Sequence, residues 1–584
     1  MIADIHITEK SFGAKVLMKN VKFSVDDGEK VGLICRNGIG KSTLFGILAG
    51  TDKDFSGETI YRKGTTVVAT AQEHHGLGKQ TVLQYILAGL PEYAGLSQII
   101  ETYPTTMGDD LKLIDEYTNA LQRFDDKGFY QIEEKVEREL ENFQLSGVAH
   151  RAFASLSGGQ KRLVEVVKIM HSDAHLALID EPTNHMDYVA KKQFIDWMKT
   201  APEAMLVITH DRDVLAEVDR IIELKDGGSQ SFKGNYDAYL KQNAHSTGTA
   251  MNEFEMVEKR IVNLKQKVID YQRLKEKSRN LQTIQKFKRL EQQSRAELAE
   301  LETKEKPTFW IDRESVENLN YKVANQYDKF KAKNIRMNMK SDESRSKHVL
   351  VSARDLSLGY DAPLFDGVNI DLREGEAIEL RGRNGAGKST LIKQLLASPS
   401  SPTKLSKTAS RPSSLEHSSA SNGAADVSDN LPASGSTMPM QLFTGELTLD
   451  PQVRVGVYEQ EVSPALFDKT LHDAIETIYL DQNLAISETK IRALMSDYLF
   501  TEGDGQVPVA KLSGGQKARL QIIQMLSNDP QLLILDEPTN HLDLPSIEEL
   551  ETALAKYSGA ILYVSHDDYF RRKIDGEVVQ IGKI

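Results

Sequence analysis

A block of 32 residues occurs twice in this chain and constrains its fold more than any other feature. Leu156 to Asp187 reads LSGGQKRLVEVVKIMHSDAHLALIDEPTNHMD, and Leu512 to Asp543 reads LSGGQKARLQIIQMLSNDPQLLILDEPTNHLD. The two copies stay in register throughout, at an offset of 356. This distance is far longer than the unit of a solenoid repeat, so it indicates a duplicated domain.

Each copy of the block has three parts. A Ser-Gly-Gly sequence precedes an amphipathic run, which predicts backbone N–H groups at a helix N-terminus, a position suited to anions. A short apolar run follows, such as Leu532 to Leu535, and it is typical of a buried parallel strand. Two acidic residues then end the strand, at the edge where open α/β sheets bind ligands. These are Asp180 and Glu181 in the first copy and Asp536 and Glu537 in the second.

A phosphate-binding loop lies upstream of each block. The first loop, from Cys35 to Thr43, reads CRNGIGKST, and the second, from Gly382 to Thr390, reads GRNGAGKST. Such a loop needs glycines so that backbone N–H groups can surround phosphates, a lysine for the β/γ oxygens, and a hydroxyl for Mg²⁺. The candidate residues are Asn37, Gly38, Gly40, Lys41, Ser42 and Thr43 in the first loop, and Asn384, Gly385, Gly387, Lys388, Ser389 and Thr390 in the second. Cys35 replaces the first glycine; we expect this to be tolerated, although it leaves the nucleotide affinity of this site open.

These motifs resemble the signature sequence and Walker B motif of ATP-binding-cassette (ABC) ATPases. The ending DEPTNHLD resembles the soluble ABC-F class, which carries two cassettes on one chain, and the resemblance covers nearly the whole sequence. It implies an α/β fold of two tandem ABC-type P-loop NTPase domains joined by a long α-helical coiled-coil hairpin. It also implies an ATPase that uses ATP and Mg²⁺.

The resemblance further implies a role for each motif residue. Glu181 and Glu537 would activate the attacking water, and His210 and His566 would sense the γ-phosphate. In the family, two cassettes pack head to tail, so each ATP lies between the phosphate loop of one cassette and the signature of the other. Expected metal ligands are Ser42, Gln72, Asp180, Ser389, Gln460 and Asp536. Phe12 and Tyr360 would stack on adenine, and the signatures would be Ser157, Gly158, Gly159 and Gln160, and Ser513, Gly514, Gly515 and Gln516.

Composition excludes several other classes of protein. The net charge is −13, so any binding of RNA must come from local basic patches. The single cysteine rules out a disulfide framework and cysteine-ligated zinc or iron–sulfur sites. The N-terminus MIADIHITEK lacks the apolar core of a signal peptide, and no apolar run approaches the roughly 20 residues that span a bilayer. We therefore expect a cytoplasmic protein without a membrane domain, most simply a monomer.

Offsets between the two copies locate one insertion in each cassette. We expect a first cassette at 1–243 with a helical arm inserted at about 87–134, where Leu111, Ile114, Tyr117, Leu121 and Phe124 suggest an amphipathic hairpin. The second cassette spans 348–584, with a Ser/Pro-rich insertion at 398–440 that is too poor in apolar residues to fold. A linker at 244–347 joins the two cassettes. The arm resembles the segment with which ABC-F proteins touch the ribosome, although a solvated helical insertion fits its sequence too.

The linker is the most basic part of the chain. From Met251 to Glu305 it contains no glycine or proline, which predicts two long helices with a turn near Lys277 to Leu281. Between Lys259 and Arg289 there are 11 Lys and Arg residues, against only two acidic ones. The charge could serve solubility alone, or it could contact the phosphates of folded RNA. We expect the charges at the tip to add little to the helix–helix seam.

For ABC-F proteins the partner is the ribosome, including rRNA and tRNA at the exit (E) site. The resemblance therefore implies action on translation, either as a translation factor or by protecting the ribosome from antibiotics. The motifs alone show only an ATP-driven clamp, so two alternatives stay open. One is the ATPase subunit of a transporter, and the other is an ATPase of DNA repair or chromosome maintenance.

Overall fold

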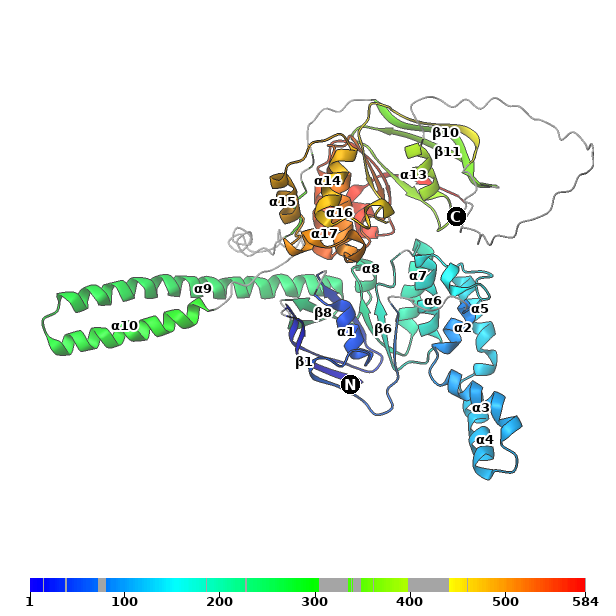
Figure 1. Ribbon diagram of the computed structural model, residues 1–584, viewed down its shortest axis with the longest axis horizontal. Coiled ribbons are helices and arrows are strands. Elements are labelled where there is room, and N and C mark those ends of the chain that lie inside the picture. Colours follow the sequence, from blue (N-terminus) through cyan, green and yellow to red (C-terminus); the bar gives the residue numbers. More distant parts are fainter. Residues whose placement is uncertain are drawn as a thin grey trace, which may run out of the picture.

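The computed structural model describes residues 1–13, 15–36, 39–71, 80–184, 186–225, 228–303, 334–337, 339, 348–360, 362–397, 441–459 and 461–582. They form two α/β cassettes joined by a long helical hairpin, and a shorter hairpin projects from the first cassette (Figure 1). The expected fold class is therefore confirmed. Within the described ranges, no helix is long and apolar enough to cross a membrane.

The first cassette contains two sheets. One is antiparallel with the order β2-β1-β4, and the other has the order β5-β6-β7-β3-β8-β9, in which β9 is antiparallel to β8. The strands are β1 Ala3–Phe12, β2 Lys15–Val25, β3 Lys30–Cys35, β4 Ser56–Tyr61, β5 Val67–Ala69, β6 Leu176–Asp180, β7 Ala204–Ile208, β8 Arg220–Lys225 and β9 Gly228–Lys233. The central parallel strands put their carboxyl ends at one edge, where Asp180 ends β6.

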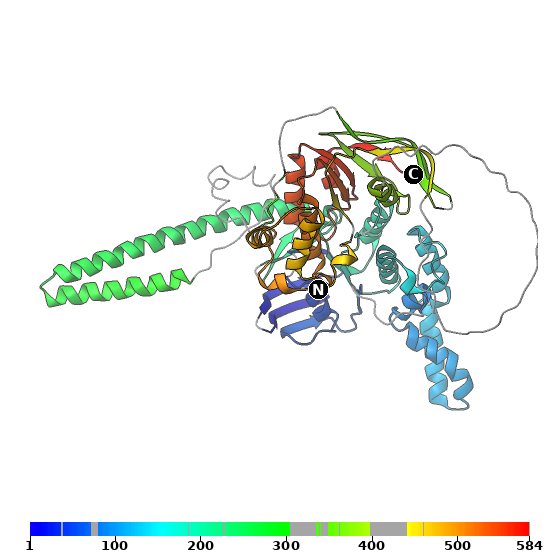
Figure 2. The same cartoon turned by 45° about the horizontal axis from the view of Figure 1, so that its top comes forward.

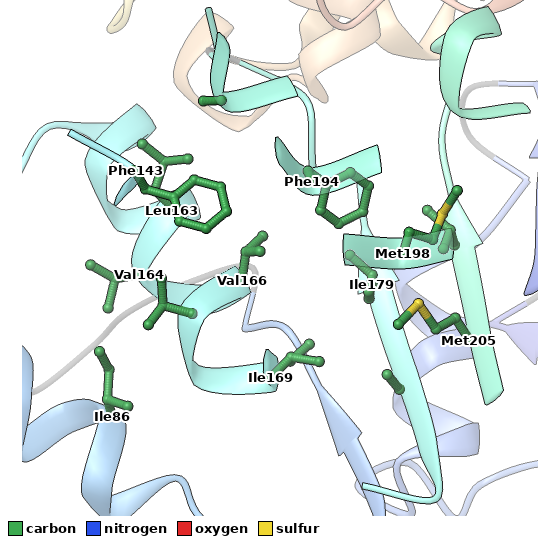
Figure 3. Packing of buried hydrophobic residues seen from close by; sticks show 14 of the residues in the cluster. Ile86, Phe143, Leu163, Val164, Val166, Ile169, Ile179, Phe194, Met198 and Met205 are labelled. Atoms are coloured by element: carbon green, nitrogen blue, oxygen red, sulfur yellow. The ribbon is translucent and has the colours of Figure 1, made fainter. Parts of the chain in front are cut away.

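Strand β6 is buried along its whole length, as its sequence predicts. Because side chains alternate across a strand, Leu176 and Leu178 join the hydrophobic cluster on one face, while Ala177 and Ile179 join the cluster on the other. Figure 3 shows the second cluster, in which helix α6 (Gly158–Met170) packs between the helical part of the cassette and the sheet. Burial on both faces fixes the position of Asp180 and Glu181 at the end of the strand.

The helices of the first cassette surround these sheets. Their bounds are α1 Lys41–Leu48, α2 Val82–Ala88, α3 Tyr93–Thr106, α4 Leu111–Asp126, α5 Ile132–Asn142, α6 Gly158–Met170, α7 Tyr188–Thr200 and α8 Arg212–Leu215, with 3₁₀ turns at Phe129–Gln131 and Phe153–Ser155. The predicted helical hairpin is present as α3 and α4. Phe124 packs against Tyr93 and Phe129, with ring centroids 5.7 and 5.3 Å apart. Leu111 was expected on the packed face but is 77% exposed, because it is the first residue of α4, next to the hairpin turn.

The second cassette repeats the plan. Its sheets have the orders β11-β10-β13 and β14-β15-β16-β12-β17, and the second of these is parallel throughout. The strands are β10 Val349–Gly359, β11 Pro363–Arg373, β12 Ala377–Arg381, β13 Gln441–Leu449, β14 Val455–Tyr458, β15 Leu532–Asp536, β16 Ala560–Val564 and β17 Glu577–Gln580. The helices are α13 Lys388–Ala397, α14 Leu471–Asp481, α15 Glu488–Asp497, α16 Gly514–Leu526, α17 Leu544–Ala555 and α18 Asp568–Ile574, with 3₁₀ turns at Pro464–Leu466, Gly503–Gln506 and Val509–Lys511.

The linker forms the predicted two-helix hairpin. Helix α9 spans Tyr236–Lys277 and α10 spans Leu281–Glu302, so the predicted turn is confirmed. Leu264 and Val268 are buried in the seam, and the rings of Tyr271 and Phe287 stack at 6.2 Å. Both hairpins project from the cassettes, in different directions (Figures 1 and 2).

Helix α9 begins earlier than the glycine-free run suggested. Asn235 caps it by accepting a hydrogen bond from the N–H of Ala238, and the helix continues through Gly248 without a break. The reason is tertiary packing, because Tyr236 and Tyr239 are buried in the core of the first cassette. The base of the linker is therefore part of the cassette.

The chain reaches the second cassette through a short anchored segment, 334–337. Ile335 is buried in the core of the second cassette, and Asn334 Nδ2 donates to the carbonyl of Pro545 at 2.7 Å. The linker has a second basic stretch at Lys322 to Lys347, and most of it lies outside the described residues, as does the whole insertion at 398–440.

Candidate nucleotide sites

The second phosphate loop connects the end of β12 to the start of α13. Lys388 Nζ is turned back on this loop, donating to the carbonyls of Gly382 at 2.6 Å and Arg383 at 3.0 Å. Burial lowers the pKa of Lys388 below its ordinary value. Ser389 Oγ donates to Asp536 Oδ2 at 2.8 Å, so the hydroxyl and carboxylate expected at the metal lie together.

The residues around Asp536 fit a magnesium ion. Its second oxygen, Oδ1, is buried and has no hydrogen-bond partner among the described residues. A buried carboxylate oxygen left unsatisfied is costly unless something binds it. Mg²⁺ takes oxygen ligands from one or two carboxylates and hydroxyls and completes its shell with water and phosphate. Burial raises the pKa of Asp536, which a cation would oppose.

Glu537 and His566 form a buried pair beside Asp536. Glu537 has a positive φ of 51°, and its N–H donates to the carbonyl of Val564, the last residue of β16. The N–H of His566 donates to Glu537 Oε2 at 3.2 Å, and His566 Nε2 lies 3.3 Å from Glu537 Oε1. Burial raises the pKa of Glu537 to about 7 and lowers that of His566 to about 3, so the imidazole is neutral at neutral pH. Strained backbone of this kind is typical of functional sites.

A cavity of about 630 Å³ lies over this site and is lined by both cassettes. From the second cassette it receives the phosphate loop, the acidic pair, His566 and Tyr360. From the first it receives the signature residues Ser157, Gly158, Gly159 and Gln160. The expected pairing of the second phosphate loop with the first signature is therefore present.

Each signature serine begins a helix. Ser157 caps α6 and Ser513 caps α16, and each forms a reciprocal capping box with the glutamine three residues later. In each box the serine Oγ accepts the N–H of the glutamine, and the glutamine Oε1 accepts the N–H of the serine. The two glycines of each signature lie between these two residues. The positive end of the α6 dipole therefore lies at the cavity between the cassettes.

Asp187 is a site residue to which the sequence analysis gave no role. Its Oδ1 accepts the N–H groups of Val189 and Ala190 at the start of α7, while its Oδ2 accepts the N–H of Asn384 in the opposite phosphate loop at 3.0 Å. Gln144 also donates to it and lines the cavity. The signal was available, because Asp187 recurs as Asp543 at the end of the repeated block.

The first site holds its lysine differently. Lys41 Nζ lies 2.6 Å from His210 Nε2 and 3.4 Å from Glu181 Oε1, and His210 Nε2 is 3.6 Å from the same carboxylate oxygen. Burial acts to lower the pKa of Lys41, but the groups around it, Glu181 first among them, together outweigh burial and the pKa ends above its ordinary value. Glu181 has a φ of 46°, close to that of Glu537. On the other side of the interface, Asp543, which corresponds to Asp187, has its Oδ2 4.0 Å from Nε of Arg36 in the first phosphate loop.

Cys35 is part of the hydrophobic core rather than of the phosphate site. It is the last residue of β3, pairs with Leu224 of β8 and is 3% exposed. Burial raises the pKa of its thiol to about 12. At the matching position, a Cβ on Gly382 would clash with the carbonyl of Ile581. The second loop thus requires a glycine at this position, because the backbone packs closely there. This constraint does not apply to Cys35 in β3.

The two candidate adenine-stacking residues differ in their surroundings. Tyr360 lines the cavity of the second site and is 39% exposed. Phe12 is 57% exposed, with Lys10 Nζ 5.0 Å above its ring. Asn37, Gly38, Gln72 and Gln460 lie outside the described residues.

Known proteins match this chain over nearly its whole length. A sequence-family profile described as "ABC transporter" matches residues 18–184 and 365–540. "Putative ATP-binding protein YdiF" of Bacillus subtilis is 30% identical over all of this chain and 80% of its own length. "ABC transporter F family member 5" of Arabidopsis thaliana is 28% identical, over 98% of this chain and 74% of its own.

Two further comparisons extend these matches. "Energy-dependent translational throttle protein EttA" of Mycobacterium tuberculosis is 26% identical, over 96% of this chain and 88% of its own length. A solved structure titled "Crystal structure of the complex of archaeal ribosomal stalk protein aP1 and archaeal ribosome recycling factor aABCE1" matches 97% of this chain and 86% of its own, with a TM-score of 0.53 and 16% identity. At that identity the match shows a shared tandem-cassette fold.

Proposed function

The chain belongs to the ABC-F family of tandem-cassette ATPases, and from this premise we propose that it binds the ribosome and uses ATP hydrolysis to act on translation. One observation carries the proposal: the cavity of about 630 Å³ combines a phosphate loop from one cassette with a signature helix from the other. A γ-phosphate bound there would bridge the cassettes, and its hydrolysis would remove the bridge. The relative called a translational throttle protein and the basic hairpin point to translation.

At each site the two acidic residues would have different roles, one at the metal and one at the attacking water. In the second site, Ser389 and Asp536 would hold Mg²⁺, which when bound neutralises charge on the phosphates. Glu537, raised in pKa and fixed by the N–H of His566, would orient the attacking water and take its proton. The neutral imidazole of His566 would face the γ-phosphate. Lys41, Ser42, Asp180, Glu181 and His210 would take these parts in the first site, completed by the signature Ser513 to Gln516.

The basic linker offers a surface for RNA phosphates. Four of its 11 Lys and Arg residues form ion pairs within the hairpin: Lys259 with Glu255, Arg260 with Glu297, Lys265 with Glu302, and Lys275 with Glu291. The remaining seven are exposed and make no ion pair with any described residue: Lys267, Arg273, Lys277, Arg279, Lys286, Lys288 and Arg289. This surface, with the arm α3–α4, would contact rRNA and tRNA at the exit site.

One expectation about the tip is wrong. Lys275 was expected to add little to the seam, but its ammonium group lies 2.7 Å from Glu291, whose side chain is buried between the helices. Lys275 therefore belongs to the hairpin structure, and near the turn Arg273, Lys277 and Arg279 are the cations that make no ion pair with any described residue.

The test is co-sedimentation with ribosomes in the presence of a non-hydrolysed ATP analogue. Replacing Arg273, Lys277 and Arg279 by Gln should weaken binding at 150 mM salt and flatten its salt dependence by about one unit of log–log slope per lost phosphate contact. ATP hydrolysis by the isolated protein should stay unchanged. The matched control replaces the three paired cations Arg260, Lys265 and Lys275, which should destabilise the hairpin more than it changes the slope. Equal affinities and slopes for variant and parent would reject the tip as an RNA contact.

A second experiment distinguishes two functions that would both include ribosome binding. A translation factor and a ribosome-protection protein would both co-sediment, but only the second changes drug susceptibility. A panel of ribosome-targeting antibiotics on cells with and without the protein distinguishes them. A failure to sediment with ribosomes under any condition would favour the transporter or chromosome alternatives.

A further inference from the structure

The interface between the two sites contains an ammonium group that no sequence motif includes. Lys191, on α7 of the first cassette, is buried with 6% exposure. Its Nζ forms ion pairs with Asp211, at 2.9 Å, and with Asp213, both on its own cassette. The same atom donates to the backbone carbonyl of His566, in the second cassette, at 3.1 Å.

This contact joins the loops that carry the two histidines. Asp211 directly follows His210 of the first site, and His566 belongs to the second site. A small cavity of about 40 Å³ lies between the sites, and Lys191 lines it together with Glu181, His210, Glu537 and His566. Lys191 is therefore placed at the junction of the two catalytic groups without lining the nucleotide cavity itself.

The sequence repeat does not reproduce the contact of Lys191 in the second cassette. At the offset that relates the two cassettes, Lys191 corresponds to Ile547, which has no donor, and Asp213 corresponds to Tyr569. Burial alone would lower the pKa of Lys191, but Asp211 and Asp213 outweigh it, so the group is charged. A charged donor on a carbonyl forms a stronger hydrogen bond than a neutral one.

We propose that Lys191 is a positioning residue for the second ATP site, through which the first cassette holds the His566 loop in place. The inference rests on the roles proposed above for Glu537 and His566. The N–H of His566 donates to Glu537 and its carbonyl accepts from Lys191, so this one peptide segment is held from both sides. Loss of the Lys191 contact would let the imidazole and Glu537 move together, away from the attacking water.

The first site should depend on Lys191 much less. In the second site Lys191 contacts the carbonyl of the histidine itself, whereas in the first it contacts the carboxylates of Asp211 and Asp213, one and three residues beyond His210. The two sites are therefore expected to respond differently to the same substitution, which a general loss of structure would not produce.

The experiment measures turnover of each site separately in the full chain. Glu181→Gln leaves only the second site active, and Glu537→Gln leaves only the first. Adding Lys191→Met should lower kcat about ten-fold in the Glu181→Gln background, because small misplacements of catalytic groups are costly. KM for ATP should change less than two-fold there, and kcat should fall less than three-fold in the Glu537→Gln background. Lys191→Arg, which keeps the charge and donors, should restore at least half of the lost kcat.

Controls separate positioning from folding. Lys192→Met changes the exposed neighbour on α7 and should alter neither site. Lys191→Met combined with Asp213→Asn removes one of the two carboxylate charges that Lys191 pairs with, and should give the same site-selective loss if the single variant is unstable. An equal fall at both sites, or no fall at the second site, would overturn the proposal. Undiminished turnover in the Glu181→Gln/Glu537→Gln double variant would instead overturn the assignment of the catalytic glutamates, whatever Lys191 does.

Discussion

The two ATP sites carry nearly the same motifs, yet they hold their phosphate-loop lysines in different ways. In the first site, Lys41 contacts His210 and Glu181, the residues expected to act on the γ-phosphate. In the second, the contacts of Lys388 with described residues are to carbonyls of its own loop. Burial acts alike at both sites, raising the pKa of the glutamate and lowering that of the histidine. ATP must displace an ion pair to reach the first lysine but not the second. Duplicated motifs therefore do not imply equivalent sites.

The largest expected effect concerns the interface that brings the sites together. Arg212 of the first cassette and Glu551 of the second are both buried and lie 2.8 Å apart. Their counterparts in the repeat, Asp568 and Ile195, cannot form a matching pair. Arg212→Met should cost roughly 3 to 5 kcal/mol, because it leaves the carboxylate buried and unpaired.

The measurement is the first thermal transition of the nucleotide-free protein. Adding Glu551→Leu to Arg212→Met should recover most of the loss, since replacing both partners of a buried pair is often nearly neutral. Equal stability of parent and single variant would show that this one-sided contact does not hold the cassettes together.

Removing both catalytic glutamates should have the next largest effect. The Glu181→Gln/Glu537→Gln variant should bind ATP but release phosphate at least about 100-fold more slowly, the usual cost of losing a general base. Each single variant then reports the contribution of the other site. Residual activity above about a tenth of the parent's would contradict the assignment, and unequal single variants would sharpen the difference between the sites.

Matched alanine substitutions at the start of the phosphate loops test the structural difference there. Gly382→Ala places a Cβ against the carbonyl of Ile581 and should destabilise the second cassette by about 2 kcal/mol, as overpacking does. Cys35→Ala removes one buried sulfur and should cost the first cassette about 1 kcal/mol. Thermal unfolding of both variants checks this order, and the reverse order would mean that Cys35 does more than fill the core.

The smallest expected effect is on ATP affinity. Glu→Gln at either site removes negative charge near the γ-phosphate, but only Glu181→Gln also releases a lysine. We expect the gain in ATP affinity to be about five-fold greater for Glu181→Gln than for Glu537→Gln. This ratio corresponds to the free energy of one modest hydrogen bond. Calorimetry with a non-hydrolysed analogue measures each site, with Lys388→Met or Lys41→Met silencing the other. Equal gains would remove this distinction between the sites.

Much of this architecture could be predicted because it is written in local sequence. Apolar runs before Asp180 and Asp536 become strands buried on both faces, and the glycine-free linker becomes two helices with the turn where the charges cluster. The Ser-Gly-Gly sequences lie at helix N-termini, as predicted. Local signals of this kind need no knowledge of distant partners.

The rest depends on contacts between distant segments. Nothing near Lys191 in the sequence marks it, since its meaning comes from the carbonyl of His566, 375 residues away. The partner of Lys275 follows from hairpin register, which the apolar pattern locates only approximately. The early start of α9 reflects burial of Tyr236 and Tyr239, which tertiary packing decides rather than helix propensity.

Because α9 starts inside the first cassette, a rotation of that cassette turns the whole helix with it. The helix has 42 residues, and its buried first turn packs against Phe232 of β9, with the rings of Phe232 and Tyr239 4.9 Å apart. At 1.5 Å per residue, the rod is about 63 Å long. A cassette rotation of about 5° therefore displaces the hairpin tip by about 5 Å, with no hinge along α9 to absorb the motion. Any sub-ångström change at the ATP sites that turns the first cassette is thereby magnified at the far end of the molecule.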